Sequence, residues 1–425
     1  MEEADYTGRM SEPNRLGAKE AARRIERGEL AAEDLLRSCL ERIAARENDV
    51  RAWSYLVPRI ALAQAKAADA PLHGIPVGVK DIFDTYDMPT EYGSRIYAGH
   101  QPRADAASVA LARRAGATIL GKTATCEFAT FVPTMTRNPH DLARTPGGSS
   151  SGSAAAVADF MVPLAFGTQT AGSVIRPGSY CGVVAYKPTY NFLPRAGVKA
   201  EADSLDTVGL FARSVEDVAF FASALTGRRG LEASAERPRI AICRTHEWES
   251  VQPEMAQCLE RAARTLPLEE AVLPERFRGL RAAHAAILWY EVSRSFADEF
   301  MRSPELIDPK LRERCAAGFA MDVDEYVDAL SYAAACRASL EDAFGEHDVL
   351  LAPAATGEAP LGEATGDIAM NVVWTLLHTP CVSVPAGRGP NAMPLGLQVI
   401  GRIGDDARTL ACAKWLHWRL QGGGL

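Results

Sequence analysis

The sequence predicts an α/β protein whose strands form one sheet. In the first half, a buried strand at 74–81 precedes a helix at 108–115 and a second strand at 117–121. Such alternation is typical of an α/β core. Further strand-like segments at 349–353 and 381–385 lie near the C-terminus. Strands in both halves favour one interwoven sheet over separable domains, and the chain has no fixed-period repeat.

The chain before residue 71 is expected to be mainly helical. Apolar residues recur at helical spacing over 18–30 and, more strongly, over 32–46. Two such helices either cap the core or supply a dimer surface, and capping is the simpler interpretation.

The second half is predicted to be rich in helix. A segment at 226–238, rich in Gly, Arg and Glu, is expected to be a surface linker before a strand at 239–243. The remaining expected elements are helices at 253–266, 277–302, 309–319, 322–344 and 405–420 and a strand at 395–400.

Composition and charge argue against several classes of protein. The 425 residues are 47% hydrophobic and 24% charged, as in ordinary globular enzymes. The net charge of −8 argues against nucleic acid or anionic membranes as the main partner. No apolar run approaches the roughly 18 residues that a membrane helix needs. The start of the chain, residues 1–15, is polar and acidic, unlike a signal peptide, so we expect a cytoplasmic protein.

The nine cysteines are widely and irregularly spaced, without a CxxC pair. That pattern indicates free, mostly buried thiols in a reducing compartment. The eight histidines are scattered, and no HExxH motif or Cys/His cluster occurs. We therefore expect no metal site.

Two clusters of small residues carry the chemistry. The first, 147–153, is Gly- and Ser-rich and runs directly into an apolar segment, which makes a flexible linker the weaker alternative. The second cluster, 170–173, contains Ser173, which is a candidate nucleophile. The amide N–H groups of Thr170, Ala171 and Gly172 are accessible beside their small side chains. One good oxyanion donor contributes about 3–4 kcal/mol in well-studied cases, so we expect an acyl-transfer site.

Lys80 is the candidate base because it ends the apolar strand. Burial favours the neutral amine, which accepts a proton. The alternative is an ion pair with the neighbouring Asp81. His73 and His140 lie near the clusters in sequence but are less well placed, so a Ser–Lys system explains the residues better than a Ser–His–Asp triad.

Taken together, these motifs resemble the amidase signature family. The interval between Ser149 and Ser173 also matches that between the two catalytic serines of the family. The matching segments are Gly147–Gly152, Gly167–Arg176 and Lys187-Pro188-Thr189, with Gly74-Ile75-Pro76, Asn138-Pro139 and 181–184 as context.

The resemblance implies a fold and a domain organisation. The expected fold is a single α/β/α sandwich around a mixed, mostly parallel twisted sheet. One amidase domain would cover 1–425, with N-terminal helices at 1–70, the signature core at 71–225 and a helical, variable substrate-pocket part at 226–425. The N-terminal helices make a homodimer plausible.

The resemblance also implies the roles of the site residues. Ser173 becomes the acyl-forming nucleophile, Ser149 the relay serine held by a cis peptide bond, and Lys80 the base. The amides of Thr170 to Gly172 hold the oxyanion, with that of Ser173 as a further candidate. The implied reaction is hydrolysis of a small carboxamide to an acid and ammonia or an amine, without metal or organic cofactor.

The second motif departs from the common family pattern. Gln169 stands where Asp is frequent, and Ala171 where Gly is frequent. This form resembles the malonamidase branch, which implies that Arg176 binds a substrate carboxylate through a two-pronged contact. The alternative is that Arg176 braces the loop. Ser150 and Ser151 are expected to bond locally.

Three functions remain open on the sequence. The leading one is an amidase acting alone on a small-molecule amide. The second is the amidase subunit of a transamidating complex that passes ammonia to a partner. The third is a scaffold without catalysis, which intact Lys80, Ser149 and Ser173 disfavour. Trp289, Trp374 and His378 either line an acyl pocket or pack in the core.

Overall fold

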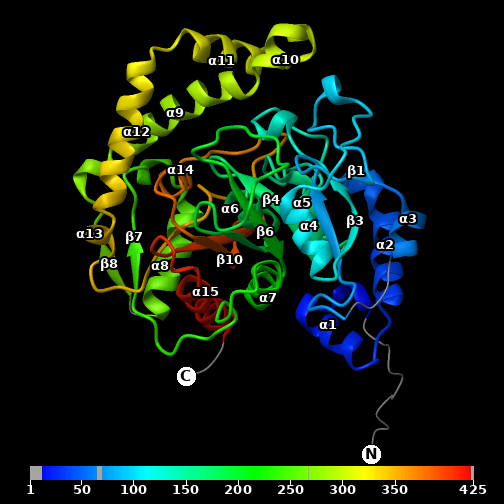
Figure 1. The fold of residues 1–425 in the computed structure, drawn as a ribbon. Coiled ribbons are helices and arrows are strands. Elements are labelled where there is room, and N and C mark those ends of the chain that lie inside the picture. Colours follow the sequence, from blue (N-terminus) through cyan, green and yellow to red (C-terminus); the bar gives the residue numbers. More distant parts are fainter. Residues whose placement is uncertain (1–11, 65–68, 267, 423–425) are drawn as a thin grey trace, which may run out of the picture.

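A computed structural model describes residues 12–64, 69–266 and 268–422. An 11-stranded sheet runs through these residues in the order β1-β3-β2-β4-β6-β5-β10-β11-β9-β7-β8 (Figure 1). The strands are β1 Trp53–Leu56, β2 Pro76–Lys80, β3 Thr118–Thr123, β4 Leu164–Gln169, β5 Val184–Lys187, β6 Thr207–Ala212, β7 Ile240–Cys243, β8 Glu269–Ala271, β9 Val349–Pro353, β10 Cys381–Arg388 and β11 Pro394–Ile400.

The sheet is mixed, as expected, and strands from both halves of the chain are neighbours in it. Strand β5 pairs with β10. Among the described strands, six neighbouring pairs are antiparallel and four are parallel. The expectation of a mostly parallel sheet is therefore wrong. Parallel pairing is confined to the groups β3-β2-β4 and β9-β7-β8, whereas the centre is antiparallel.

Helices cover both faces of the sheet. The α-helices are α1 Ala18–Glu26, α2 Ala32–Val50, α3 Pro58–Gln64, α4 Ala107–Arg114, α5 Ser151–Ala158, α6 Ile175–Cys181, α7 Val215–Thr226, α8 Pro253–Thr265, α9 Leu280–Ser295, α10 Ala297–Arg302, α11 Pro309–Ala320, α12 Val323–Ala338, α13 Glu341–Phe344, α14 Val372–Leu376 and α15 Asp406–Leu420. Short 3-10 turns are η1 Pro13–Arg15, η2 Arg95–Tyr97, η3 Glu127–Ala129, η4 Trp248–Ser250, η5 Glu275–Phe277 and η6 Pro304–Leu306.

The contacts of two adjacent residues of β4 show which helices cover each face of the sheet. The ring of Phe166 lies 5.0 Å from that of Phe221 in α7. The next residue, Gly167, faces the start of α5: a Cβ atom added to it would lie 2.8 Å from Ser150 Oγ. Successive strand residues point to opposite faces, so α5 and α7 cover opposite sides. Helix α6 packs beside α5 and α15 beside α7, which gives the expected α/β/α arrangement.

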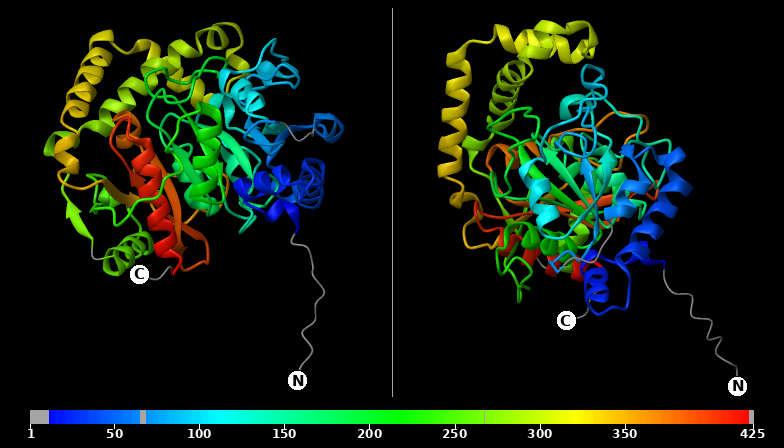
Figure 2. Two further views of the ribbon diagram at one scale, coloured as in Figure 1. Left: turned by 60° about the horizontal axis from the view of Figure 1, so that its bottom comes forward. Right: turned by 45° about the vertical axis from the view of Figure 1, so that its right-hand side comes forward.

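The two longest helices expected in the second half are interrupted. Instead of one helix over 277–302, α9 and α10 meet at Phe296, whose backbone leaves the helical conformation at φ −107° and ψ 22°. Its fully buried ring packs 4.9 Å from that of Phe128. Likewise, 322–344 divides into α12 and α13. Helices α9 to α12 project from the sheet as a separate layer (Figure 2).

The N-terminal helices lie where the capping interpretation puts them. The backbone N–H of Lys19 in α1 donates to Asp217 of α7 over 2.9 Å. Arg42 and Arg46 of α2 both pair with Asp159, just after α5. Both helices are therefore anchored to the body of the protein (Figures 1 and 2).

The cysteines and the apolar character of the helices agree with what the sequence predicts. All nine cysteines are free and buried, which confirms the expectation for the thiols. Among residues 12–64, 69–266 and 268–422, no helix is both long and apolar enough to cross a membrane. The polar start of the chain, residues 1–11, lies outside the described residues.

Candidate active site

Lys80 ends strand β2 with its side chain fully buried. Its Nζ donates to Ser149 Oγ over 2.9 Å and to Thr168 Oγ1 over 2.8 Å. The neighbouring Asp81 instead pairs with Lys122 at 3.2 Å. The alternative of a Lys80–Asp81 ion pair is therefore wrong, because successive strand residues point to opposite faces.

The surroundings of Lys80 favour its neutral form. Burial lowers the pKa of the amine from 10.5 to about 8, although the nearby acidic groups of Cys126, Glu201 and Asp206 act in the opposite direction. A buried ammonium loses its hydration, which penalises the charged state. A substantial fraction of Lys80 is therefore neutral near pH 8 and able to accept a proton from a hydroxyl.

Ser149 lies in a segment that is tied to β4. The Gly148–Ser149 peptide bond is cis, as the family resemblance implies. The next residue, Ser150, accepts from Thr168 N over 3.3 Å and donates to Thr168 O over 3.2 Å. These bonds reach across the layers to β4, so the expectation of a local bond for Ser150 is wrong. They hold Ser149 beside the strand that also carries Thr168.

Burial decreases in order from the base to the nucleophile. Lys80 is 0%, Ser149 1% and Ser173 7% exposed. The structure joins Lys80 to Ser149, but the Ser173 hydroxyl forms no hydrogen bond with Ser149 or with any other described residue. The structure thus forms the first contact of the expected relay and not the second.

The segment 170–173, which we name the oxyanion loop, presents its amide groups without partners. None of the N–H groups of Thr170, Ala171, Gly172 and Ser173 donates a hydrogen bond within the described part of the chain. Backbone donors are otherwise almost always paired in folded proteins. Unpaired amides beside a serine are what stabilisation of a tetrahedral oxyanion requires.

The carbonyl groups of Thr170, Ala171 and Gly172, by contrast, all accept a hydrogen bond. His284 Nε2 donates to Thr170 O over 2.9 Å, and Thr375 Oγ1 donates to Ala171 O over 2.7 Å. The backbone N–H of Arg176 donates to Gly172 O over 3.0 Å. The sequence motifs gave no signal for His284 or Thr375, which lie 114 and 204 residues further along the chain.

Arg176 is buried and braces two segments. Its Nη2 donates to Gly148 O and its Nε to Thr365 O, each over 2.6 Å. Its Nη1 is buried without a partner, as is Oδ1 of Asn371. Both atoms pack against Gly172, where a Cβ would lie 3.0 Å from Nη1 and 2.5 Å from Oδ1. Only glycine fits at this position of the oxyanion loop.

Two acidic residues that the sequence did not single out flank Thr170. Asp206 Oδ1 accepts from Thr170 Oγ1 over 2.6 Å, and its Oδ2 accepts from the N–H of Glu201 over 2.8 Å. Burial raises the pKa of Asp206 to about 6. Burial and the charge of Asp206 raise the pKa of Glu201 to about 8. Burial thus favours the protonated form of both carboxyl groups, which limits the negative charge near Lys80.

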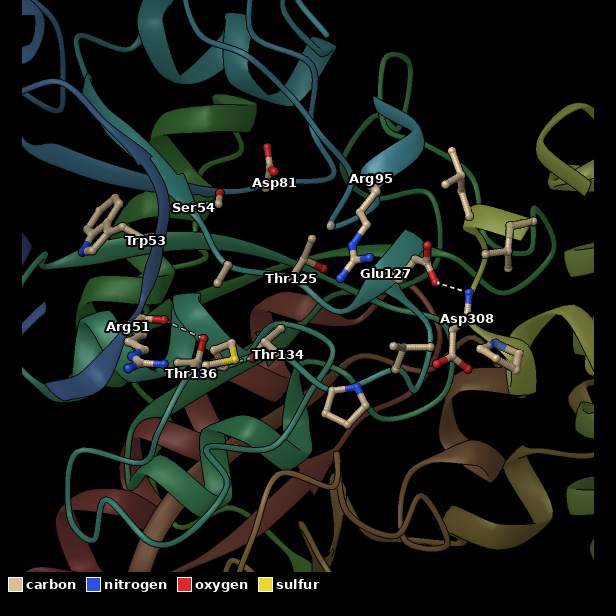
Figure 3. Close-up of a pocket in the computed structure, with 18 of the residues that line it drawn as sticks. Arg51, Trp53, Ser54, Asp81, Arg95, Thr125, Glu127, Thr134, Thr136 and Asp308 are labelled. Atoms are coloured by element: carbon tan, nitrogen blue, oxygen red, sulfur yellow. Dashed lines mark hydrogen bonds between the residues drawn. The ribbon is translucent and has the colours of Figure 1, made fainter. Parts of the chain in front are cut away.

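A cavity of about 610 Å³ is lined in part by residues that adjoin the site residues in sequence (Figure 3). Its wall includes Asp81, next to Lys80, and Thr125, next to Cys126. The N–H of Cys126 donates to Ser149 O over 3.3 Å. In Figure 3, Arg95 extends between Thr125 and Glu127. The volume is in the range of small-molecule sites, but Lys80, Ser149 and Ser173 are not among the residues that line the cavity.

The aromatic candidates of the second half have structural surroundings. Trp374 is fully buried in the core. His378 stacks on Tyr190 with ring centroids 4.1 Å apart. Trp289 packs edge-on against Phe131. These contacts correspond to core packing, the simpler of the two interpretations.

A buried lysine bonded to a serine, next to a loop of unpaired amides, is typical of hydrolases that work through an acyl-enzyme. Residues 34–410 match the amidase family, so the chain belongs to that family and is an amidase. This confirms the resemblance drawn from the motifs.

Similar proteins include an amidase and two proteins whose descriptions refer to larger complexes. A glutamyl-tRNA(Gln) amidotransferase subunit from Chloroflexus aggregans is 32% identical, over 94% of this chain and 96% of the relative. A solved structure described as an amidase is 30% identical with a TM-score of 0.88, over 95% of this chain and all of the other. A third, from a vestigial protein complex related to an s-triazine catabolic enzyme, is 28% identical with a TM-score of 0.89, over 96% and 99% of the two chains.

Proposed function

We propose that this amidase hydrolyses a small carboxamide through an acyl-enzyme on Ser173. Neutral Lys80 takes a proton from Ser149, and Ser149 takes one from Ser173. Ser173 Oγ then bonds to the amide carbon, and the N–H groups of Thr170, Ala171 and Gly172 stabilise the oxyanion. The protons return along the relay to the leaving nitrogen as the C–N bond breaks. Water hydrolyses the ester and regenerates Ser173.

The contact between Lys80 Nζ and Ser149 Oγ, 2.9 Å long and fully buried, is the observation that carries this proposal. A lysine with a pKa of about 8 is matched to proton transfer near neutral pH. The open link between Ser149 and Ser173 is compatible with the proposal, because catalytic hydrogen bonds often tighten only in the substrate complex.

Arg176 has a place in the same proposal. Its two bonds to backbone carbonyls support bracing of the relay segment. We propose in addition that Nη1 is the atom available to a substrate carboxylate, since it is the one guanidinium nitrogen of Arg176 without a partner among the described residues. Contact with a substrate requires the surroundings of Nη1 to open, because this atom is buried.

The test compares Ser173→Ala with Ser383→Ala on a panel of small amides. Ser383 is a matched control, because its hydroxyl is buried without a partner in β10. We expect Ser173→Ala to lower kcat by about 10⁴-fold or more and Ser383→Ala to leave it unchanged. Turnover by Ser173→Ala near the wild-type rate would reject the mechanism.

The alternative function is that of an ammonia-generating subunit. The 32% identity to a glutamyl-tRNA(Gln) amidotransferase subunit over nearly the whole chain favours it as the second candidate. Release of ammonia from simple amides by the lone chain would support the hydrolase. Activity that requires a co-purifying second subunit would support the alternative.

The remaining features of the proposal concern organisation. We propose a single domain over 1–425, since β5 and β10 from the two halves pair within one sheet, and a cytoplasmic location, since all nine thiols are free. A homodimer through α1 and α2 is the proposed assembly. Light scattering coupled to gel filtration measures its mass directly.

A further inference from the structure

We propose that His284 and Thr375 are positioning residues that orient the oxyanion loop. Neither belongs to the motifs, and neither touches Ser173 through a hydrogen bond. The inference rests on the proposed acyl-enzyme chemistry at Ser173 and goes beyond it by assigning a task to two residues of the second half.

The geometry of the peptide bond links each anchor to one donor. In a trans peptide, the carbonyl of one residue and the N–H of the next point in opposite directions. The bond from His284 to Thr170 O therefore fixes the direction of the Ala171 N–H. The bond from Thr375 to Ala171 O fixes that of the Gly172 N–H in the same way. Each anchor thus controls one proposed oxyanion donor.

The protonation state of His284 suits this role. Its ring is buried in α9, and burial lowers its pKa to about 4. The imidazole is therefore neutral at working pH. Because a carbonyl oxygen only accepts, the single ring proton lies on Nε2 and points at Thr170 O. The neutral ring thus gives the loop one directed hydrogen bond.

The orientation of the Thr375 hydroxyl is set by Gln169. Gln169 Nε2 donates to Thr375 Oγ1 over 2.9 Å, which leaves the hydroxyl proton free for Ala171 O. The Oε1 of Gln169 accepts from the backbone N–H of Val174 and Ile175 over 2.9 and 3.0 Å. A carboxylate at position 169 would lack the N–H donor to Thr375, so Gln169 and Thr375 act as a pair.

The two anchors come from elements that pack on each other. Helix α9 carries His284, α14 carries Thr375, and the two helices are in contact. The oxyanion loop is thus held against a pair of helices from the second half, while its serine belongs to the signature core. Both anchors are buried, so their bonds are shielded from competing water.

The test measures kcat and KM for variants that remove or restore each bond. Thr375→Val removes the hydroxyl at nearly constant volume, and Thr375→Ser restores it. His284→Leu removes the donor, and His284→Gln places an amide N–H near the position of Nε2. Matched controls are Thr409→Val and His417→Leu in α15, where both side chains are buried away from the loop.

We expect Thr375→Val and His284→Leu each to lower kcat by about 10–100-fold, with KM within about threefold of wild type, because loss of one oxyanion donor costs about 10²–10³-fold. Thr375→Ser and His284→Gln should recover most of the rate, and the α15 controls should keep it. The aldehyde matching the acyl group, which forms an oxyanion when Ser173 adds to it, should bind more weakly by the same factor.

Wild-type kcat in Thr375→Val, or a loss that Thr375→Ser does not recover, would overturn the inference. If His284→Leu does not fold, the Thr375 pair decides. Failure of the acyl-enzyme proposal has a different signature, because the Ser173→Ala variant would then retain activity. An active wild type that depends on Ser173, combined with unaffected anchor variants, rejects only the positioning role.

Discussion

Lys80 Nζ lies 2.9 Å from Ser149 Oγ at a position where both side chains are buried. Its other described hydrogen-bond partner is the Thr168 hydroxyl, 2.8 Å away, and no described carboxylate is within ion-pair distance. The amine is therefore held by neutral acceptors in a dry site, which lowers its proton affinity without displacing it from the serine. The predictions below depend on this arrangement.

The activity should depend on pH through Lys80. Because the neutral amine is the active form, kcat/KM should rise as pH increases, with a midpoint of about 8. Lys80→Met should lower kcat by about 10²–10⁴-fold and abolish this rise of kcat/KM with pH. A pH–rate series from 6 to 10 measures both. A wild-type profile that is flat across pH 8, or falls through it, would contradict the assignment.

Thr168 should tune the same midpoint. The Thr168 hydroxyl accepts a hydrogen bond from Lys80 and stabilises the ammonium more than the neutral amine. Thr168→Val removes this acceptor, so the pKa of Lys80 should fall further. We expect the midpoint to move to lower pH and the plateau to drop by about tenfold, because Lys80 is less well oriented. Thr168→Ser, which keeps the hydroxyl, is the control. An upward shift of the midpoint in Thr168→Val would refute this explanation.

Variants of Arg176 should distinguish a bracing role from recognition of a substrate carboxylate. Arg176→Lys keeps the charge but cannot serve Gly148 O and Thr365 O together through a planar fork. If Nη1 binds a carboxylate, Arg176→Lys and Arg176→Ala should raise KM for acidic amides by about tenfold more than for neutral ones. Steady-state kinetics on paired acidic and neutral amides measures this ratio. Equal losses on both sets would leave bracing as the whole role.

The buried pair of Asp81 and Lys122 should matter for stability. Their charges lie 3.2 Å apart with almost no exposure. Asp81→Ala leaves Lys122 as an uncompensated buried charge and should cost about 3–5 kcal/mol. The double variant Asp81→Asn/Lys122→Met should recover most of that loss. Urea denaturation of wild type, Asp81→Ala and the double variant measures the difference, and a double variant no more stable than Asp81→Ala would disprove the pairing.

Local patterns predicted most of the regular elements. The strand ending at Lys80, the helix at 108–115 and the strand at 117–121 follow from short apolar runs and helical spacing. Helix α6 was not predicted, since its sequence contains Pro177 and Gly178, which are poor helix formers. The interruption at Phe296 arises from a tertiary contact with Phe128, which local sequence does not encode.

The site was predictable only where its residues share a motif. Lys80, Ser149 and Ser173 could be proposed from residue type and order, and the structure brings the first two into contact. His284 and Thr375 reach the oxyanion loop from distant helices by way of backbone carbonyls. Carbonyl groups are present at every residue, so such contacts leave no pattern in the sequence. The antiparallel centre of the sheet depends likewise on pairing between distant strands.

The most direct measurement is to locate the acyl group on the enzyme. Wild-type protein is mixed with a substrate amide, quenched in acid within milliseconds and digested for peptide mass spectrometry. The acyl mass should appear on the peptide that contains Ser173, be absent in Ser173→Ala and accumulate far more slowly in Lys80→Met. An acyl group on another residue such as Cys126, or turnover by Ser173→Ala at the wild-type rate, would contradict the account.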